Sequence, residues 1–238
     1  NATGWHPAEL SGKWVLDAGC GAGRFAEVVL QAGAKVVALD FSNAVDACFG
    51  NLNHHPNLHV VQGDIYALPF PKGFFPFVYS LGVLQHTPDV AKAFAALPPM
   101  VARGGRLCVD FYQKSWKSAL LPKHWLRPIT RRMPKDRLFA TLKWIVPRLL
   151  PISRMVGRLP LVGEVLKRLV PVANHVGILP LSEQQHLEWS LLDTFDWFSP
   201  EYDSPQRPET VRRWLVNAGL ERVEVLKAGH LVGRAQKS

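Results

Sequence analysis

Three glycines at alternate positions follow a short apolar run near the start of the chain. The stretch reads Val15-Leu16-Asp17-Ala18-Gly19-Cys20-Gly21-Ala22-Gly23, and a helical pattern begins directly after it. Because glycine has no Cβ, a glycine-rich turn between a strand and a helix lets the backbone approach a ligand closely. The carboxylate of Asp17 would repel a pyrophosphate and would suit a cationic or amine-bearing ligand. The pattern therefore predicts a ligand-binding turn.

The spacing argues against two other kinds of ligand-binding loop. A dinucleotide-binding turn has the pattern G-x-G-x-x-G, whereas here the third glycine comes one residue early and Arg24 follows it. A P-loop ends in Gly-Lys-Ser/Thr, and that ending is absent. The simplest alternative is a structural turn with no ligand.

A second acidic residue stands where a nucleoside could be held. Asp40 ends the apolar run 35–40, twenty-one residues after Gly19. In doubly wound folds, an acidic residue at the end of the second strand accepts hydrogen bonds from ribose hydroxyls. A solvated aspartate at a strand end is the alternative, but the distance from the glycine loop favours ribose binding.

Strand and helix patterns alternate around these residues. Apolar runs predict strands, and periodic apolar stripes predict helices between them. The alternation stops at Gln113 and resumes near Pro208. The predicted strands are 14–18, 35–40, 58–62, 74–81, 107–112, 223–226 and 231–232, and the predicted helices are 22–32, 42–52, 90–97 and 209–218.

From the glycine loop onward, the sequence resembles the class I S-adenosylmethionine (SAM)-dependent methyltransferases, whose first motif reads acidic-x-Gly-x-Gly-x-Gly. In that family an acidic residue after the third strand binds the adenine amine and the next apolar residue packs on the ring, and Asp64 and Ile65 match. Leu68-Pro69-Phe70 resembles the small-molecule branch, the type 11-like enzymes. The stretch 80–89 resembles the loop that lines the methionine end of SAM and the acceptor pocket. The resemblance implies SAM as cofactor, bound by Asp17, Gly19, Gly21, Gly23, Asp40, Phe41, Asp64, Ile65, Ser80, Leu81 and Gln85.

The resemblance covers residues 13–112 closely and residues 208–235 more loosely. It implies an α/β fold with a Rossmann-like, doubly wound, seven-stranded sheet whose last strand is antiparallel. We expect this SAM-binding domain to comprise residues 1–112 and 208–238, with a helical insertion over 113–207. Because the first strand begins by about Lys13, we also expect that substrate-binding residues which precede it in the family are missing.

His86 is the candidate catalytic residue. Histidine is the side chain whose ordinary pKa lies closest to neutrality, so His86 could take a proton from an acceptor hydroxyl. Alternatively, it only hydrogen-bonds the loop or orients SAM. The family usually has an aspartate where this chain has Pro76, which leaves open a protein that binds SAM without turnover. The Asn/Asp-Pro-Pro-Tyr signatures of methylation at nucleic-acid amino groups are absent, so nucleic acid is not the expected partner.

The inserted segment carries the positive charge of the chain. The net charge is +9, and Phe111 to Leu181 holds fourteen Lys or Arg against only Asp136 and Glu164. Eight prolines predict short helices here, with apolar stripes at 138–149 and 161–170. The alternatives are a helical lid, a surface for anionic lipid over 113–181, and recognition of an acidic substrate. The stretch 192–205 has no clear periodicity and predicts a loop that supplies the acceptor-pocket residues Asp196, Tyr202 and Asp203, or else a well-packed connection.

The spacing of the cysteines and the lengths of the apolar runs limit the kinds of site and the location that we expect. Three cysteines without ligand spacing predict neither a disulfide framework nor a metal site. There is no run of 18 apolar residues and no leader pattern, which favours a cytoplasmic location, with peripheral membrane association as the second prediction. We therefore expect methyl transfer from SAM to oxygen of a small-molecule, glycan or lipid-linked acceptor. The alternatives are a non-catalytic SAM-binding protein, methylation of a membrane lipid at carbon or nitrogen, and a nucleotide-sugar or nicotinamide enzyme.

Overall fold

The computed structural model describes residues 2–114, 122–175 and 180–238, and contacts within the chain divide it into two compact units. The first unit comprises Asn1–Lys114 and Tyr202–Ser238, and the second comprises Ser115–Glu201. The insertion was expected over 113–207, so both of its expected ends fall in the first unit. The part of the expected basic surface at 115–121 and 176–179 lies outside the described residues.

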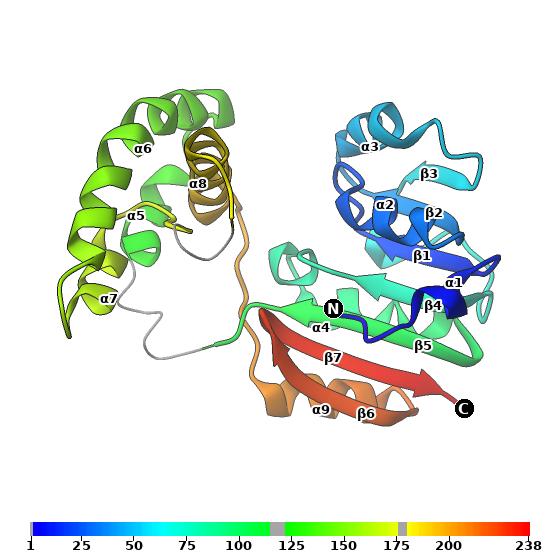
Figure 1. Ribbon diagram of the computed structural model, residues 1–238. Coiled ribbons are helices and arrows are strands. Elements are labelled where there is room, and N and C mark those ends of the chain that lie inside the picture. The colour runs from blue at the N-terminus through cyan, green and yellow to red at the C-terminus, as the bar shows by residue number, and fades with distance from the viewer. Residues whose placement is uncertain (1, 115–121, 176–179) are drawn as a thin grey trace. The chain divides into compact units, whose positions relative to one another are not determined.

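A seven-stranded sheet forms the middle layer of the first unit (Figure 1). Its order is β3-β2-β1-β4-β5-β7-β6. β1 to β5 pair in parallel, whereas β7 runs antiparallel to both β5 and β6. The predicted doubly wound sheet with an antiparallel final strand is therefore confirmed. The strands are β1 (Trp14–Ala18), β2 (Lys35–Asp40), β3 (Leu58–Gln62), β4 (Phe75–Ser80), β5 (Val101–Phe111), β6 (Leu220–Ala228) and β7 (His230–Lys237).

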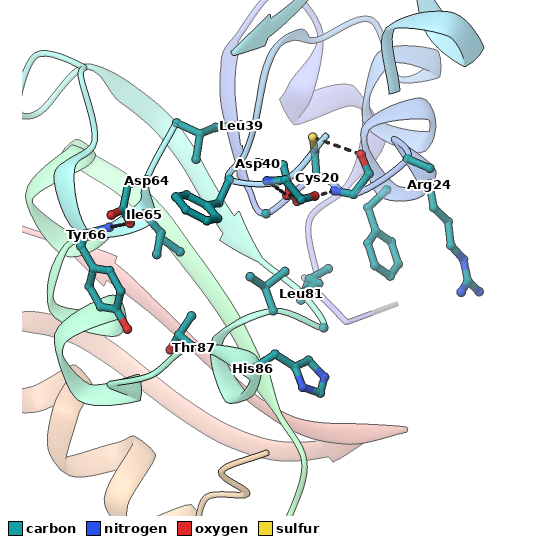
Figure 2. Close-up of a pocket in the computed structure, with 18 of the residues that line it drawn as sticks. Cys20, Arg24, Leu39, Asp40, Asp64, Ile65, Tyr66, Leu81, His86 and Thr87 are labelled. Atoms are coloured by element: carbon teal, nitrogen blue, oxygen red, sulfur yellow. Dashed lines mark hydrogen bonds between the residues drawn. The ribbon is translucent and has the colours of Figure 1, made fainter. Parts of the chain in front are cut away.

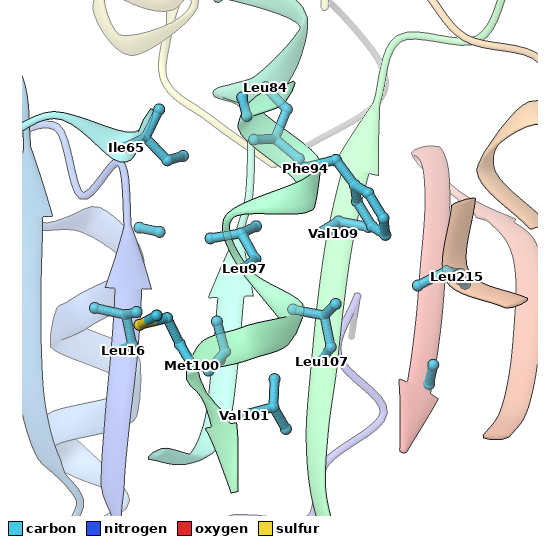
Figure 3. Close-up of a cluster of buried hydrophobic side chains, with 14 of the residues drawn as sticks. Leu16, Ile65, Leu84, Phe94, Leu97, Met100, Val101, Leu107, Val109 and Leu215 are labelled. Atoms are coloured by element: carbon cyan, nitrogen blue, oxygen red, sulfur yellow. The ribbon is translucent and has the colours of Figure 1, made fainter. Parts of the chain in front are cut away.

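Helices cover both faces of this sheet, because successive residues of a strand point to opposite faces and both sets are apolar. α1 (Pro7–Leu10), α2 (Arg24–Gln31) and α3 (Ala44–Leu52) pack on one face. α4 (Val90–Ala95) and α9 (Pro208–Asn217) pack on the other, where Leu16, Phe94, Leu107, Val109 and Leu215 form one apolar cluster (Figure 3). Short 3₁₀ turns, η1 (Ile65–Ala67), η2 (Leu84–His86) and η3 (Pro98–Met100), complete the unit.

Pro76 lies at the start of β4, where a proline costs the sheet least. There the pairing with β5 shifts from Phe75–Val101 to Phe77–Arg106, so residues 102–105 bulge out of the ladder. Residues 103–105, which precede the predicted strand 107–112, thus form a bulge inside one long strand. Gly104 has a φ of +70°, which suits glycine.

The second unit is helical, and its longest helix contradicts one sequence prediction. α6 (Lys135–Gly157) continues through Pro147 and Pro151, so prolines do not cut it into short pieces. Each interior proline costs about 3 kcal/mol. Against this, Leu138, Leu142, Val146 and Leu150 bury one stripe of α6 against α8 (Glu183–Phe198), at about 1.5–3 kcal/mol each. Both prolines face solvent and do not interrupt the buried stripe. Burial of the stripe therefore outweighs the cost of the prolines.

The described residues of this unit also form α5 (Pro122–Thr130), α7 (Gly163–Leu166) and the 3₁₀ turn η5 (Lys167–Leu169). The expected loop over 192–205 is wrong for its first half, because Leu192 to Phe198 belong to α8. Ser182 and Gln185 form a capping box that starts α8, which sequence reasoning missed. Among the described residues, no helix has the length and apolar character needed to span a bilayer.

Candidate functional site

Turns at the carboxyl ends of β1 to β4 enclose a cavity of about 750 Å³. It lies where the strand order reverses between β1 and β4, the usual position of ligands in open α/β sheets. In Figure 2, Asp64 and Ile65 lie at one end, Asp40 and Cys20 along one side, and Leu81 and His86 along the other. Of the predicted site residues, the cavity is lined by Gly19, Gly21, Asp40, Phe41, Asp64, Ile65, Leu81 and His86.

The three glycines of the loop have different tasks. All three have positive φ, at 94° for Gly19, 52° for Gly21 and 91° for Gly23. A Cβ on Gly19 would come within 2.4 Å of Val83, and one on Gly23 within 2.6 Å of Leu52, so these two positions need glycine for packing. A Cβ on Gly21 would meet nothing within 4 Å. Gly21 is therefore the position where open backbone faces the cavity and a ligand could approach.

Asp40 connects the second strand to the glycine loop. Its Oδ2 accepts a hydrogen bond from the Gly21 N–H at 2.9 Å. Its Oδ1 accepts from the Ser42 N–H at 2.9 Å and from the Ser42 hydroxyl at 2.7 Å. A carboxylate has about four acceptor positions, so about one remains, on Oδ2, for a ribose hydroxyl. The sequence predicted the ribose role but missed the loop-holding role.

The far end of the cavity is built around Asp64. This residue caps η1, where its Oδ1 accepts from the Tyr66 N–H at 2.9 Å. Ile65 and the 75%-exposed ring of Phe41 add apolar surface to the same cavity. A carboxylate beside apolar walls suits a flat heterocycle that carries an amine. The open Gly21 backbone, the Asp40 carboxylate and the Asp64–Ile65 end therefore line one cavity.

Four of the residues predicted to bind SAM do not line the cavity. Asp17 and Ser80 are buried in the sheet behind it, where the Tyr79 hydroxyl donates to Asp17 Oδ2 at 2.8 Å and the Ser80 hydroxyl donates to the Ala18 carbonyl at 2.7 Å. Gly23 packs against α3. Gln85 is fully buried in η2, and its side-chain amide has no hydrogen-bond partner among the described residues. These residues shape the turns from behind, so the predicted charge contact from Asp17 to a ligand is replaced by a structural role.

Burial raises the pKa of Asp17 from its ordinary value of 3.8 to about 7. An unfolded chain would ionise this carboxyl above about pH 4, whereas the native protein holds the proton to about pH 7. The contribution of Asp17 to the free energy of unfolding is therefore largest below about pH 4 and falls by about 4 kcal/mol by about pH 7. We predict that Asp17→Asn, which keeps an acceptor for Tyr79, raises the denaturation midpoint at pH 7.5 and leaves it nearly unchanged at pH 4. Equal shifts at both pH values in urea titrations would contradict this.

His86 is the titratable side chain best placed for proton transfer. It lines the cavity, and its Nδ1 lies 3.0 Å from the carbonyl oxygen of Tyr202. A carbonyl can only accept, so Nδ1 carries the proton of this contact, and Nε2 is the ring nitrogen that a neutral imidazole would offer as a base. The ring also packs edge-on against Tyr112, at 5.5 Å between centroids. Tertiary structure thus supplies the orienting group that the sequence could not show.

The three predicted acceptor residues belong to different units of the chain. Tyr202 and Asp203 belong to the first unit, where the segment Tyr202–Gln206 lies beside η2 and the end of β5. The Ser204 N–H donates to the Gln85 carbonyl at 2.9 Å, and the Gln206 N–H donates to the Tyr112 carbonyl at 2.8 Å. Asp196 is an exposed residue of α8 in the second unit. A single loop that presents all three is therefore wrong, because Asp196 belongs to the helix α8.

Sequence reasoning missed several residues of the cavity wall. Leu39 comes from β2, and leucine is not a type of residue that signals a ligand. Arg24 was noted only as a break in the dinucleotide pattern, although it brings a positive charge to the wall. The other missed residues are Cys20, Ala22, Phe25, Ser42 and Tyr66, whereas Gly82, Val83, Thr87 and Pro88 belong to the predicted stretch 80–89. In the described part of the chain, no group of three or more His, Cys, Asp or Glu is arranged to hold a metal ion.

Part of the chain is similar to known methyltransferases. Residues 16–109 match a family model described as "Methyltransferase domain". The ubiquinone biosynthesis O-methyltransferase of Thiobacillus denitrificans is 33% identical over 132 residues, which cover 54% of this chain and 56% of that protein. The enzyme of the same name from Azotobacter vinelandii is 33% identical over 115 residues, covering 47% of this chain and 50% of that protein. The matched region thus spans about half the length of these curated relatives.

Solved structures show the same fold. A SAM-dependent methyltransferase from Mesorhizobium loti has a TM-score of 0.54 at 16% identity, covering 96% of this chain and 93% of that one. Magnesium protoporphyrin IX methyltransferase from Synechocystis has a TM-score of 0.52 at 17% identity, covering 97% of this chain and 77% of that one. Together with the glycine loop and the sheet order, the family match over residues 16–109 agrees with the resemblance to class I SAM-dependent methyltransferases.

Proposed function

We propose that this protein transfers a methyl group from SAM to an oxygen atom of a small-molecule acceptor. The observation that carries the proposal is one cavity in which the open backbone of Gly21, the partly used carboxylate of Asp40, the Asp64–Ile65 pair and His86 meet. Oxygen is favoured because a histidine with an unprotonated Nε2 suits removal of a hydroxyl proton. The names of the matched relatives also refer to O-methylation.

The residues divide the work in a simple way. When bound, SAM supplies an electrophilic methyl group on a sulfonium. Gly21 and Asp40 would hold its amino-acid and ribose parts, and Asp64 with Ile65 would hold the adenine. His86 would accept the acceptor proton at Nε2 while its Nδ1–H stays bonded to the Tyr202 carbonyl. Because such a displacement needs mainly proximity and alignment, fixed turns around a single cavity are sufficient scaffolding.

Calorimetric titration with SAM and with NAD tests the cofactor. Binding of SAM without binding of NAD supports the proposal, and the reverse would overturn it. Methyl-labelled SAM incubated with an extract of the source cells then tests the acceptor. Label in the organic phase supports a lipid or lipid-linked acceptor, whereas label in the aqueous phase supports a soluble or glycan acceptor. SAM binding with no label in either phase would favour a SAM-binding protein that does not turn over.

The second unit offers a surface that suits anionic lipid, which supports peripheral membrane association. Leu161 is fully exposed, and Val162, Val165 and Leu169 are each at least 50% exposed. Most of the apolar stripe predicted at 161–170 therefore faces solvent. Arg158, Lys167 and Arg168 belong to the same segment, and basic residues beside exposed aliphatic side chains are typical of interfacial helices.

We predict that the protein co-sediments with vesicles containing phosphatidylglycerol at low salt and not with neutral vesicles. Replacing Leu161 and Val165 together with aspartate should reduce the bound fraction about tenfold, because both hydrophobic and electrostatic attraction are lost. The matched control is Val28→Asp, a 63%-exposed aliphatic residue of the first unit, which should bind vesicles like the wild type. Equal binding by all three proteins would exclude this surface, and no vesicle binding by the wild type would leave the second unit as a lid or an acidic-substrate segment.

A further inference from the structure

The carboxylate of Asp110 joins two segments that are distant in sequence. Asp110 is the penultimate residue of β5 and is only 7% exposed. Its Oδ1 accepts a hydrogen bond from the Gly82 N–H at 2.6 Å. Its Oδ2 lies 3.1 Å from Nδ1 of His230, the first residue of β7. One buried carboxylate therefore connects the turn after β4 with the start of the antiparallel strand.

The Gly82 end of this connection belongs to the cavity wall. Gly82 has a φ of +76° and lines the cavity together with Leu81 and Val83. The side chain of Val83 lies directly against Gly19, where a Cβ would come within 2.4 Å. A shift of the Gly82 peptide would thus also displace Val83 and, through it, the glycine loop that Val83 contacts. Asp110 fixes the direction of that peptide.

The His230 end keeps the carboxylate in place. A buried carboxylate needs hydrogen-bond partners on both oxygens. The Gly82 N–H is the partner of Oδ1, and His230 is the partner of Oδ2. The Tyr112 ring packs edge-on against His230, at 5.2 Å between centroids, and edge-on against His86 at 5.5 Å. The arrangement therefore extends from β7 through Tyr112 to the candidate base.

We propose that Asp110 is a positioning residue for SAM binding and that His230 orients it. Asp110 does not line the cavity, so its effect on a ligand passes through the backbone of Gly82. This inference rests on the proposed function, because it takes SAM as the ligand of the cavity. It assigns a role in that site to the last strand of the sheet, outside the matched residues 16–109.

The experiment is calorimetric titration of SAM into a set of variants of the full chain. Asp110→Ala removes the acceptor for Gly82 and should raise the dissociation constant about tenfold, equivalent to about 1.4 kcal/mol. Asp110→Asn keeps an acceptor oxygen and should restore binding to within about threefold of the wild type. His230→Phe keeps a ring beside Tyr112 but removes Nδ1, and should weaken binding about threefold. Glu9→Gln is the control. Glu9 pairs with Arg106, which lies on β5 like Asp110 but far from Gly82 in the ladder.

The outcomes separate this inference from the proposed function. Wild-type protein that binds no SAM would overturn both. Wild-type binding with unchanged dissociation constants in Asp110→Ala and His230→Phe would overturn the positioning role alone. If Asp110→Ala does not fold, Asp110→Asn and His230→Phe decide, and a threefold loss in His230→Phe with near-normal binding in Asp110→Asn supports the role. A loss in Glu9→Gln equal to that in His230→Phe would show a general loss of stability and would reject it.

Discussion

Replacing Asp40 with alanine is expected to weaken SAM binding by about a hundredfold. The carboxylate would bind the ribose through its remaining acceptor position, and it also holds the Gly21 N–H at 2.9 Å. Hydrogen bonds to charged groups contribute about 1.5–3 kcal/mol each, and every 1.4 kcal/mol is a factor of ten in affinity. Loss of the ribose contact and loosening of the loop should each lower the affinity for SAM about tenfold. Calorimetric titration with SAM measures this directly.

Two further variants separate the two roles of Asp40. Asp40→Asn keeps one acceptor oxygen but loses the charge, so its affinity should fall between those of the wild type and of Asp40→Ala. Ser42→Ala removes only the hydroxyl that donates to Oδ1 and should change the dissociation constant less than about threefold. An unchanged dissociation constant in Asp40→Ala would remove Asp40 from the SAM site and would favour the solvated strand-end alternative.

Replacing His86 with alanine is expected to lower kcat about a hundredfold while SAM affinity changes less than about threefold. General-base catalysis contributes about 10²- to 10⁴-fold, and His86 contributes its ring to the cavity wall rather than a charge to SAM. Transfer of label from methyl-labelled SAM to the acceptor fraction of a cell extract measures the rate. A rate within threefold of the wild type would assign the acceptor proton to another group.

Asparagine and glutamine at position 86 distinguish a base from a loop anchor. The asparagine amide sits where Nδ1 does in histidine and can still donate to the Tyr202 carbonyl, but it has no Nε2. If His86 is a base, His86→Asn loses activity as fully as His86→Ala. If His86 only anchors the segment Tyr202–Gln206, His86→Asn keeps near-normal activity and His86→Gln loses it. Tyr202→Phe is the control, because the contact uses the backbone carbonyl of Tyr202.

Much of the first unit could be predicted from the sequence, because the patterns that specify its strands, turns and helices are local. An apolar run followed by Gly19, Gly21 and Gly23 dictates a strand, a turn of positive φ and a helix, whatever the rest of the chain does. The acidic residues that end β2 and follow β3 must reach the same sheet edge, since the carboxyl ends of parallel strands lie together. Asp40 and Asp64 were therefore predictable as cavity residues, and both line it.

The errors arose where packing overrides local preference. Proline favours a helix break, yet α6 continues through Pro147 and Pro151 because its buried stripe against α8 outweighs that preference. The irregular composition of 192–198 favours a loop, yet the segment is helical because Thr194 and Phe198 are buried along one side. The charged residue before the glycine loop suggested a ligand contact, but the sheet buries Asp17 and pairs it with Tyr79.

What the sequence by itself determined is the cofactor end of the protein: the turn, the acidic strand ends and the family they indicate. Only the tertiary structure decided which of those side chains reach the cavity, that the Nδ1 of His86 donates to the Tyr202 carbonyl, and that Asp110 bridges Gly82 and His230. The physical reason is distance along the chain. Contacts within a turn follow from adjacent residue types, whereas a bond between positions 110 and 230 exists only once β7 has paired antiparallel with β5.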